Sequence, residues 1–219
     1  MYNCLYSVYS EIVLSRAMTP RPYRMARRRV SADQTRARII AATRELIIDQ
    51  EGVGTFSLEE VARRAGVARM TVYYQFGSLR GLLEALLDSL AIAGGMDHLA
   101  EAFRLADARA ALDRYIAVFI GFWESDRPVL RRLGALATLD PELRTMLEQR
   151  YGWRRKGIAV ILERLAKQTS RPKPREMKEA ADLLFLLTSF VTFDTLAADR
   201  RTPAQVTRLL QRTAHRLLG

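Results

Sequence analysis

A short run of side chains between Arg69 and Gln75 has the chemistry needed to bind the edges of DNA bases. Arginine can pair with guanine through two hydrogen bonds, glutamine can do the same with adenine, and methionine can contact a thymine methyl group. Single hydroxyls, such as those of Thr71 and Tyr73, hold phosphates better than they distinguish bases. The residues that we expect to be exposed for such contacts are Arg69, Met70, Thr71, Tyr73, Tyr74 and Gln75, with Tyr74 alternatively folded back on Phe76.

The residues around this run have the spacing of two crossing helices joined by a tight turn. Ser57 is suited to cap the first helix, and Glu60 three residues later would complete a capping box. Ala62 is small where two helices would cross closely, Gly66 suits a turn that needs positive φ, and Val72 falls on the inner side of the second helix. The pattern predicts a helix-turn-helix, with an ordinary helical hairpin as the alternative.

Helical patterns lie on both sides of this pair. Residues 35–47 form an amphipathic pattern whose apolar face includes Ile39 and Leu46. Downstream, Ser78 can cap a longer, leucine-rich helix. We therefore expect a three-helix unit that leads into a fourth helix over residues 32–93.

With these elements in place, the sequence resembles the TetR family of bacterial transcriptional regulators. The most specific part of the resemblance is the run Gly-Val-x-x-x-Thr-Val-Tyr-x-x-Phe from Gly66 to Phe76. The remainder of the chain agrees with the family in its length and its helical pattern. Further matching residues are Arg36, Ile39, Ile40, Ala42, Leu46, Gly52, Phe56, Ser57, Val61, Ala62, Ala65, Leu82 and Leu83.

Two positions depart from the family pattern. Ala68 stands where the family usually has a Ser or Thr that caps the second helix, and Leu79 stands where a phosphate-contacting Lys is usual. Arg80 can replace that Lys, although it points in a different direction on the helix. The resemblance implies DNA contacts by Ser57 and Arg80 in addition to the run described first. It also implies a homodimer on a palindromic double-stranded operator, and repression that a small-molecule effector relieves.

The composition favours an all-α protein. The chain has 219 residues, of which 49% are hydrophobic, and it contains only 7 Pro and 12 Gly. We find no strand-like alternation. The prediction is a basic arm over residues 1–30, a helix-turn-helix domain over 31–77, and a helical ligand-binding and dimerisation domain over 78–219, with about nine helices in all.

The formal net charge of +11 favours a polyanionic partner. The highest density of positive charge is in residues 1–30, which hold six arginines against Glu11 alone. Such an arm, through Arg27, Arg28 and Arg29, could contact phosphates or the minor groove. The alternative is a solvated, disordered tail.

The first 17 residues do not join the pattern that follows. They lack the basic region and apolar stretch of a secretory signal, so we expect a cytoplasmic protein that does not enter a membrane. Our hypothesis is that translation starts at Met18 or Met25, which the intact mass of the native protein would decide. Cys4, the only cysteine, lies in this segment, so thiol-based redox sensing by the rest of the chain is excluded.

The second domain is expected to provide the dimer contact and an effector site. Helices are predicted over 107–125, 126–136, 140–168 and 176–198, and from Thr202 onward. Because residues 176–217 carry more apolar surface than one subunit can cover, we expect them to form a four-helix dimer interface, with a monomer as the alternative. Aromatic residues and methionine suit an apolar or aromatic ligand, although such residues at helical spacing are more often part of the core. The candidates are Phe103, Tyr115, Phe119, Phe122, Trp123, Met146, Tyr151, Trp153 and Phe190.

Nothing in the sequence predicts an enzyme, a cofactor or a metal. The two histidines, His98 and His215, are far apart and outside any metal motif, and nucleophile-elbow, phosphate-loop and dinucleotide motifs are absent. Asp194 is the one acidic residue inside an apolar helix, where it faces a pocket or pairs with an arginine across the dimer, most simply in a structural role. A DNA-coating protein would explain the net charge but not the large apolar second domain, so this class remains the alternative to a sequence-specific regulator.

Overall fold

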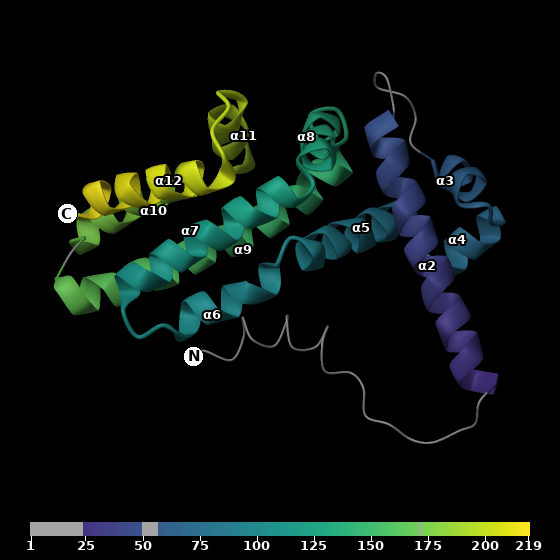
Figure 1. Ribbon diagram of the computed structural model, residues 1–219, viewed down its shortest axis with the longest axis horizontal. Coiled ribbons are helices and arrows are strands. Elements are labelled where there is room, and N and C mark those ends of the chain that lie inside the picture. Colours follow the sequence, from purple (N-terminus) through teal and green to yellow (C-terminus); the bar gives the residue numbers. More distant parts are fainter. Residues whose placement is uncertain (1–23, 50–56, 171) are drawn as a thin grey trace. The chain divides into compact units, whose positions relative to one another are not determined.

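The computed structural model describes residues 24–49, 57–170 and 172–219, and these residues form helices joined by short turns (Figure 1). The described part of the chain contains eleven α-helices and one short 3-10 helix, without strands. The all-α prediction is confirmed, whereas the predicted number of about nine helices is too low. The chain divides into two compact units between Leu86 and Leu87.

The first unit is a small bundle around one apolar cluster. It consists of α2 (Arg24–Asp49), α3 (Leu58–Ala65), α4 (Arg69–Phe76) and the first half of α5 (Leu79–Ala93). Helix α3 packs on both α2 and α4. The buried residues that hold these helices together are Ile39, Ala42, Leu46, Val61, Ala62, Ala65, Val72 and Leu82.

The turn between α3 and α4 has the conformation that the sequence predicts. Gly66 ends α3 in the left-handed region, at φ 62°, and its amide donates to the carbonyls of Ala62 and Arg63. The amide of Val67 also donates to the carbonyl of Ala62, at 3.0 Å. Glycine adopts this conformation without the steric cost that a Cβ atom brings.

The start of α2 differs from the prediction. The sequence suggested an arm that extends to residue 30, whereas the backbone is already helical from Arg24. The predicted DNA-contacting residues Arg27, Arg28 and Arg29 therefore belong to the first turns of α2, and their side chains lie outside the described part. The predictions for Cys4, Met18, Gly52 and Phe56 also concern residues outside the described ranges.

The second unit contains the remaining helices, with boundaries close to those predicted. Asp107 and Asp140 cap α7 and α9, because each carboxylate accepts from two backbone amides of the first turn. The helices are η1 (Met96–His98), α6 (Leu99–Arg104), α7 (Ala108–Ser125), α8 (Arg127–Leu136), α9 (Pro141–Thr169), α10 (Pro174–Leu187), α11 (Phe190–Ala198) and α12 (Pro203–Leu218).

The apolar segment predicted as one element over residues 176–198 is two helices. A break at Thr188 and Ser189 separates α10 from α11, and the two axes differ in direction by 50°. Ser189 caps α11 by accepting from the amide of Thr192, and the carbonyl of Thr188 accepts from the indole N–H of Trp123 at 2.9 Å. Side chains thus satisfy the polar groups that the break leaves unpaired.

Among the described residues, no single helix is both long and apolar enough to cross a bilayer. Of the described helices, only the bent pair α10–α11, taken together, has the length and composition of a membrane-spanning segment. The described residues also contain no group of three or more His, Cys, Asp or Glu side chains that could hold a metal ion.

Asp194 has a structural role within its own chain. Its carboxylate accepts from Arg127 at 2.5 Å and from Arg131 at 2.7 Å, which joins α11 to α8. Hydrogen bonds from Arg131 and Arg127 hold the pKa of Asp194 below its usual value. This pairing confirms the structural role. The predicted pairing with an arginine across the dimer is wrong, because both arginine partners belong to the same subunit.

The turn at Gly66 can be tested by substitution. We expect Gly66→Ala to lower the free energy of unfolding by about 1–2 kcal/mol, because the added Cβ strains the left-handed conformation. Gly134 is a matched control, because it lies exposed in α8 with no atom within 4 Å of an added Cβ. Gly134→Ala should instead stabilise the protein by about 0.5–1 kcal/mol. Denaturant unfolding measures both effects, and an unchanged Gly66→Ala protein would contradict the assignment.

Candidate nucleic-acid interface and effector site

Helix α4 has one buried side and one exposed side. The side chain of Val72 has no exposed surface and lies in the cluster with Ala62 and Ala65. Tyr74 is 80% exposed, and Met70 and Tyr73 are each about half exposed. Helical geometry therefore turns the opposite face of α4 to solvent.

The structure brings the six predicted base- and phosphate-contacting residues onto this one short helix. Arg69 is the first residue of α4 and is exposed, whereas Thr71 and Gln75 are half-buried at the edges of the face. The ring of Tyr74 meets the ring of Tyr73 edge-on, with centroids 6.4 Å apart. Since Tyr74 is largely exposed, the alternative in which it folds back on Phe76 is wrong.

The caps of α3 and α4 differ as the sequence suggested. The hydroxyl of Ser57 accepts from the amide of Glu60 at 3.3 Å, but the carboxylate of Glu60 pairs with Arg63. The cap is therefore present, whereas the second half of the predicted capping box is not. Ala68 occupies the cap position of α4 without a side-chain hydrogen bond, which leaves the first amides of that helix without this support.

Arg36 holds the end of α4, and this role was missed in the sequence analysis. Its guanidinium donates to the carbonyl of Gln75 at 3.0 Å and lies over the ring of Phe76 at 4.4 Å. A guanidinium that binds one of the last carbonyls also complements the negative end of the helix dipole. The sequence signal was present, since Arg36 is one of the residues that match the family pattern.

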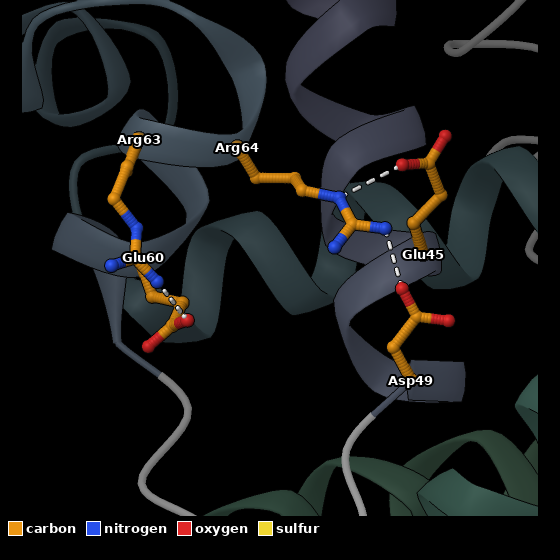
Figure 2. A network of polar contacts seen from close by, with 5 residues as sticks. All are labelled: Glu45, Asp49, Glu60, Arg63 and Arg64. Carbon is orange, nitrogen blue, oxygen red and sulfur yellow. Dashed lines mark hydrogen bonds and ion pairs between the residues drawn. The ribbon is translucent and has the colours of Figure 1, made fainter.

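A second arginine joins α3 to α2. Figure 2 shows the guanidinium of Arg64 between the carboxylates of Glu45 and Asp49, with N–O distances of 3.0 Å and 2.5 Å. The hydrogen bond to Asp49, and after it the hydrogen bond to Glu45, raises the pKa of Arg64 above its usual value. Arg63 points away from this pair and binds Glu60 of its own helix. Arg64 thus has a structural partner, whereas the arginine at the start of α4 faces solvent.

The proposed substitute for the family's phosphate-contacting Lys is engaged elsewhere. Arg80 donates to the carboxylate of Glu84 one turn later, at 2.9 Å. Ser78 caps α5 by accepting from the amide of Gly81 at 3.1 Å. Arg80 is exposed, so a phosphate contact requires it to leave an exposed ion pair, which is a weak interaction.

The predicted effector-site residues differ in their burial and in their contacts within the second unit. A continuous series of ring contacts joins Phe103, Tyr115, Phe119, Trp123 and Phe190, with neighbouring centroids 4.8–6.1 Å apart. The structure places two further candidates, Met146 and Phe122, in the core, while Trp153 is exposed. Tyr151 is half-buried, on the same helix as a residue that the sequence analysis missed, Arg154.

Arg154 is one of the few charged residues buried in the described part of the chain, with 5% of its surface exposed. It lies three residues after Tyr151 and four before the buried Ile158, so helical spacing places it on the apolar face of α9. That spacing was the available signal. The sequence analysis missed the burial of Arg154 because this residue lies in a run of basic residues, which is typical of an exposed face.

The fold of the first unit defines a class of protein. Two short helices cross through a glycine turn, and the second presents polar and aromatic side chains to solvent while its other side is buried. This is a helix-turn-helix domain, a class of fold in which the second helix enters the major groove of DNA.

Comparisons with known proteins agree with this class. Residues 39–86 match the family model described as bacterial regulatory proteins, tetR family. The HTH-type transcriptional regulator EthR of Mycolicibacterium smegmatis is 32% identical over 125 residues, which are 56% of this chain and 55% of that protein. The regulator TtgR of Pseudomonas putida is 40% identical over 81 residues, 37% of each chain. The matches thus span about half or less of these relatives.

Solved structures are similar in fold to most of the chain. NalD of Pseudomonas aeruginosa, the secondary repressor of the MexAB-OprM multidrug efflux pump, has a TM-score of 0.66 and 25% identity over 85% of this chain and 97% of its own. A TetR-like transcriptional regulator from Rhodococcus sp. has a TM-score of 0.61 and 20% identity, over 83% and 94%. The chain thus resembles the tetR family of bacterial regulatory proteins in the sequence of residues 39–86 and in its fold. Its relatives are regulators, which agrees with the prediction that it is not an enzyme.

The unsupported cap of α4 leads to a stability prediction. Ala68 is exposed and has the extended backbone of a cap residue, so Ala68→Ser can supply the missing acceptor without a steric cost. We expect Ala68→Ser to raise the free energy of unfolding by about 0.5–1 kcal/mol, whereas Ala68→Val should give no increase. Thermal unfolding of the three proteins tests this, and equal gains from Ser and Val would show that capping is not the cause.

Proposed function

We propose that the protein is a sequence-specific transcriptional regulator that binds a palindromic operator as a homodimer, acts in the cytoplasm, and represses until a small molecule binds. The observation that carries this proposal is the exposed face of α4, whose opposite side is fixed by the buried side chain of Val72. The family relationship supports it, because the matched relatives are HTH-type transcriptional regulators.

The exposed residues divide by the contacts that their chemistry allows. Arg69 at the start of α4 suits two hydrogen bonds to guanine, and Gln75 suits adenine. Met70 suits a thymine methyl group, whereas Thr71 and Tyr73 suit phosphates. The backbone amides at the start of α4, which Ala68 leaves without a side-chain acceptor, suit a further phosphate.

The competing function is a DNA-binding protein without sequence preference, which the net charge of +11 alone would explain. Selection of bound fragments from a random DNA library, repeated at increasing salt, separates the two. A regulator enriches a palindrome whose half-sites lie about one helical turn apart. A non-specific binder enriches no sequence, and its affinity falls steeply as salt rises.

Arg69 provides a direct test of base readout. We expect Arg69→Ala to weaken binding to the selected DNA by about 1–3 kcal/mol and to relax the preference at one base of each half-site. Arg63→Ala is the matched control, because Arg63 is an exposed arginine of α3 that pairs with Glu60. Any loss in the control should be uniform across sequences. Unchanged selectivity in Arg69→Ala would remove this residue from the readout.

A dimer needs an apolar surface that one subunit leaves uncovered. The prediction assigned this surface to residues 176–217, but the apolar side of α12, formed by Val206, Leu210 and Ala214, is buried and α12 packs on α7. The exposed apolar side chains of this segment are instead mainly on α10 and α11. They are Leu183, Leu186, Val191 and, at the end of α12, Leu217. We therefore centre the proposed interface on α10 and α11.

A charge on this surface should prevent dimerisation. Leu186 is 59% exposed, so Leu186→Glu costs little in the free subunit but places an unpaired charge in the proposed interface. We expect it to be monomeric by light scattering and to bind the selected palindrome more weakly. Leu139→Glu is the control, since Leu139 is 63% exposed outside this segment. A dimer that persists in a Leu186→Glu, Val191→Glu double variant would contradict the proposed interface.

A further inference from the structure

Arg154 lies inside the second unit in an aromatic environment. Its guanidinium carbon is 3.9 Å from the ring centroid of Phe185, 5.7 Å from that of Tyr151 and 5.9 Å from that of Phe119. These rings come from α7, α9 and α10, so three helices surround one positive charge. Stacking on aromatic faces stabilises a guanidinium but does not neutralise it.

Arg154 has no counter-ion among the described residues, and the neighbouring arginine shows the contrast. Arg155 also lies over the ring of Phe185, at 4.2 Å, but it forms an ion pair with Asp182 and is exposed. No ion pair within the described ranges includes Arg154, and the charged or ionisable groups that act on it are two tyrosines and Arg155. The buried arginine is therefore the unpaired one.

The hydrogen bonds of Arg154 leave one edge of its guanidinium available. Nη1 donates to the carbonyl of Phe185 at 2.6 Å and to the hydroxyl of Thr188 at 2.8 Å. These are the hydrogen bonds that the side chain forms with the described residues. Nε is buried and has no partner. The edge made by Nε and Nη2 has the spacing of the two oxygens of a carboxylate.

Deprotonation does not remove this charge at neutral pH. Burial lowers the pKa of Arg154 to about 10, so the guanidinium keeps its proton at pH 7. A buried charge without a partner is costly to a fold, and buried donors without acceptors add to that cost. An anionic ligand would supply both the missing charge and the missing acceptor.

We propose that Arg154 is the anion-binding residue of the effector site and that the effector is a small carboxylate with an aromatic body. This inference names the ligand class of the regulator proposed above and rests on that proposal. The carboxylate binds the Nε–Nη2 edge of Arg154. The body of the ligand packs on aromatic rings that are half-buried and therefore accessible from solvent, namely those of Tyr151, Phe185 and Phe190.

The site is connected to the helices of the proposed dimer interface. Thr188 accepts from Arg154 through its hydroxyl and from Trp123 through its carbonyl, and it lies at the break between α10 and α11. A ligand that binds the guanidinium and shifts its position changes the hydrogen bonding at this break. Ligand binding is thus coupled to the orientation of the two helices that carry the exposed apolar residues.

The test compares aromatic acids with their neutral amides on the full-length protein. Benzoate, phenylacetate, 1-naphthoate and indole-3-acetate are each paired with the matching carboxamide, and binding is followed by calorimetry and by the melting temperature. We expect at least one acid to bind about 10- to 100-fold more tightly than its amide, as charge-assisted hydrogen bonds to a buried arginine provide. A series in which no acid exceeds its amide overturns the proposal.

Variants then assign the effect to Arg154. Arg154→Gln should remove the preference of the acid over the amide, and Arg154→Lys should retain only part of it, because an ammonium lacks the two-pronged edge. Lys156→Gln, which removes an exposed charge from the same helix, should bind like the wild type. An acid that binds Arg154→Gln as tightly as the wild type contradicts the assignment. If Arg154→Gln fails to fold by circular dichroism, Arg154→Lys and the acid–amide comparison decide.

Failure of this inference can be told from failure of the proposed function. Acid binding is measured without DNA, and selection from the DNA library is measured without acid. Enrichment of a palindrome without any acid preference overturns the ligand class alone. Acid binding that requires Arg154 in a protein that enriches no DNA sequence overturns the regulator and leaves the anion site in place.

Discussion

The burial of Val72 determines which face of α4 meets solvent. Its branched side chain fills the space left by the small residues Ala62 and Ala65 of α3, so the two helices approach closely and α4 cannot rotate without exposing an apolar group. Gly66 makes the close approach possible, because only glycine adopts that turn at little cost. The exposed position of the residues between Arg69 and Gln75 is a consequence of this packing, and the proposed contacts with DNA depend on it.

In the second unit, the break at Thr188 connects three structural features that lie far apart in the sequence. Its carbonyl binds Trp123 of α7, its hydroxyl binds Arg154 of α9, and its position ends α10. A single buried threonine thus links the aromatic series, the unpaired guanidinium and the apolar helices of the proposed interface. Because these groups share hydrogen bonds, a ligand that binds one of them acts on the other two.

Local patterns predicted the turns and caps well, because these depend on neighbouring residues. Ser57, Gly66 and Asp140 each adopt the expected role, since a cap or a glycine turn involves residues three or four positions apart. Long-range pairs could not be predicted in the same way. The contact of Arg36 with the end of α4 and the burial of Arg154 depend on segments about 30 or more residues away, and a run of basic residues gives no sign of which member is buried.

The proposed function requires α4 to bind in the major groove twice, once from each subunit of a dimer. Methylation interference on a fragment recovered by selection tests this most directly, because dimethyl sulfate modifies guanine at N7 in the major groove and adenine at N3 in the minor groove. We expect guanine methylation to block binding at two symmetric clusters about one helical turn apart. Interference only at adenine N3, or at no position, would contradict it.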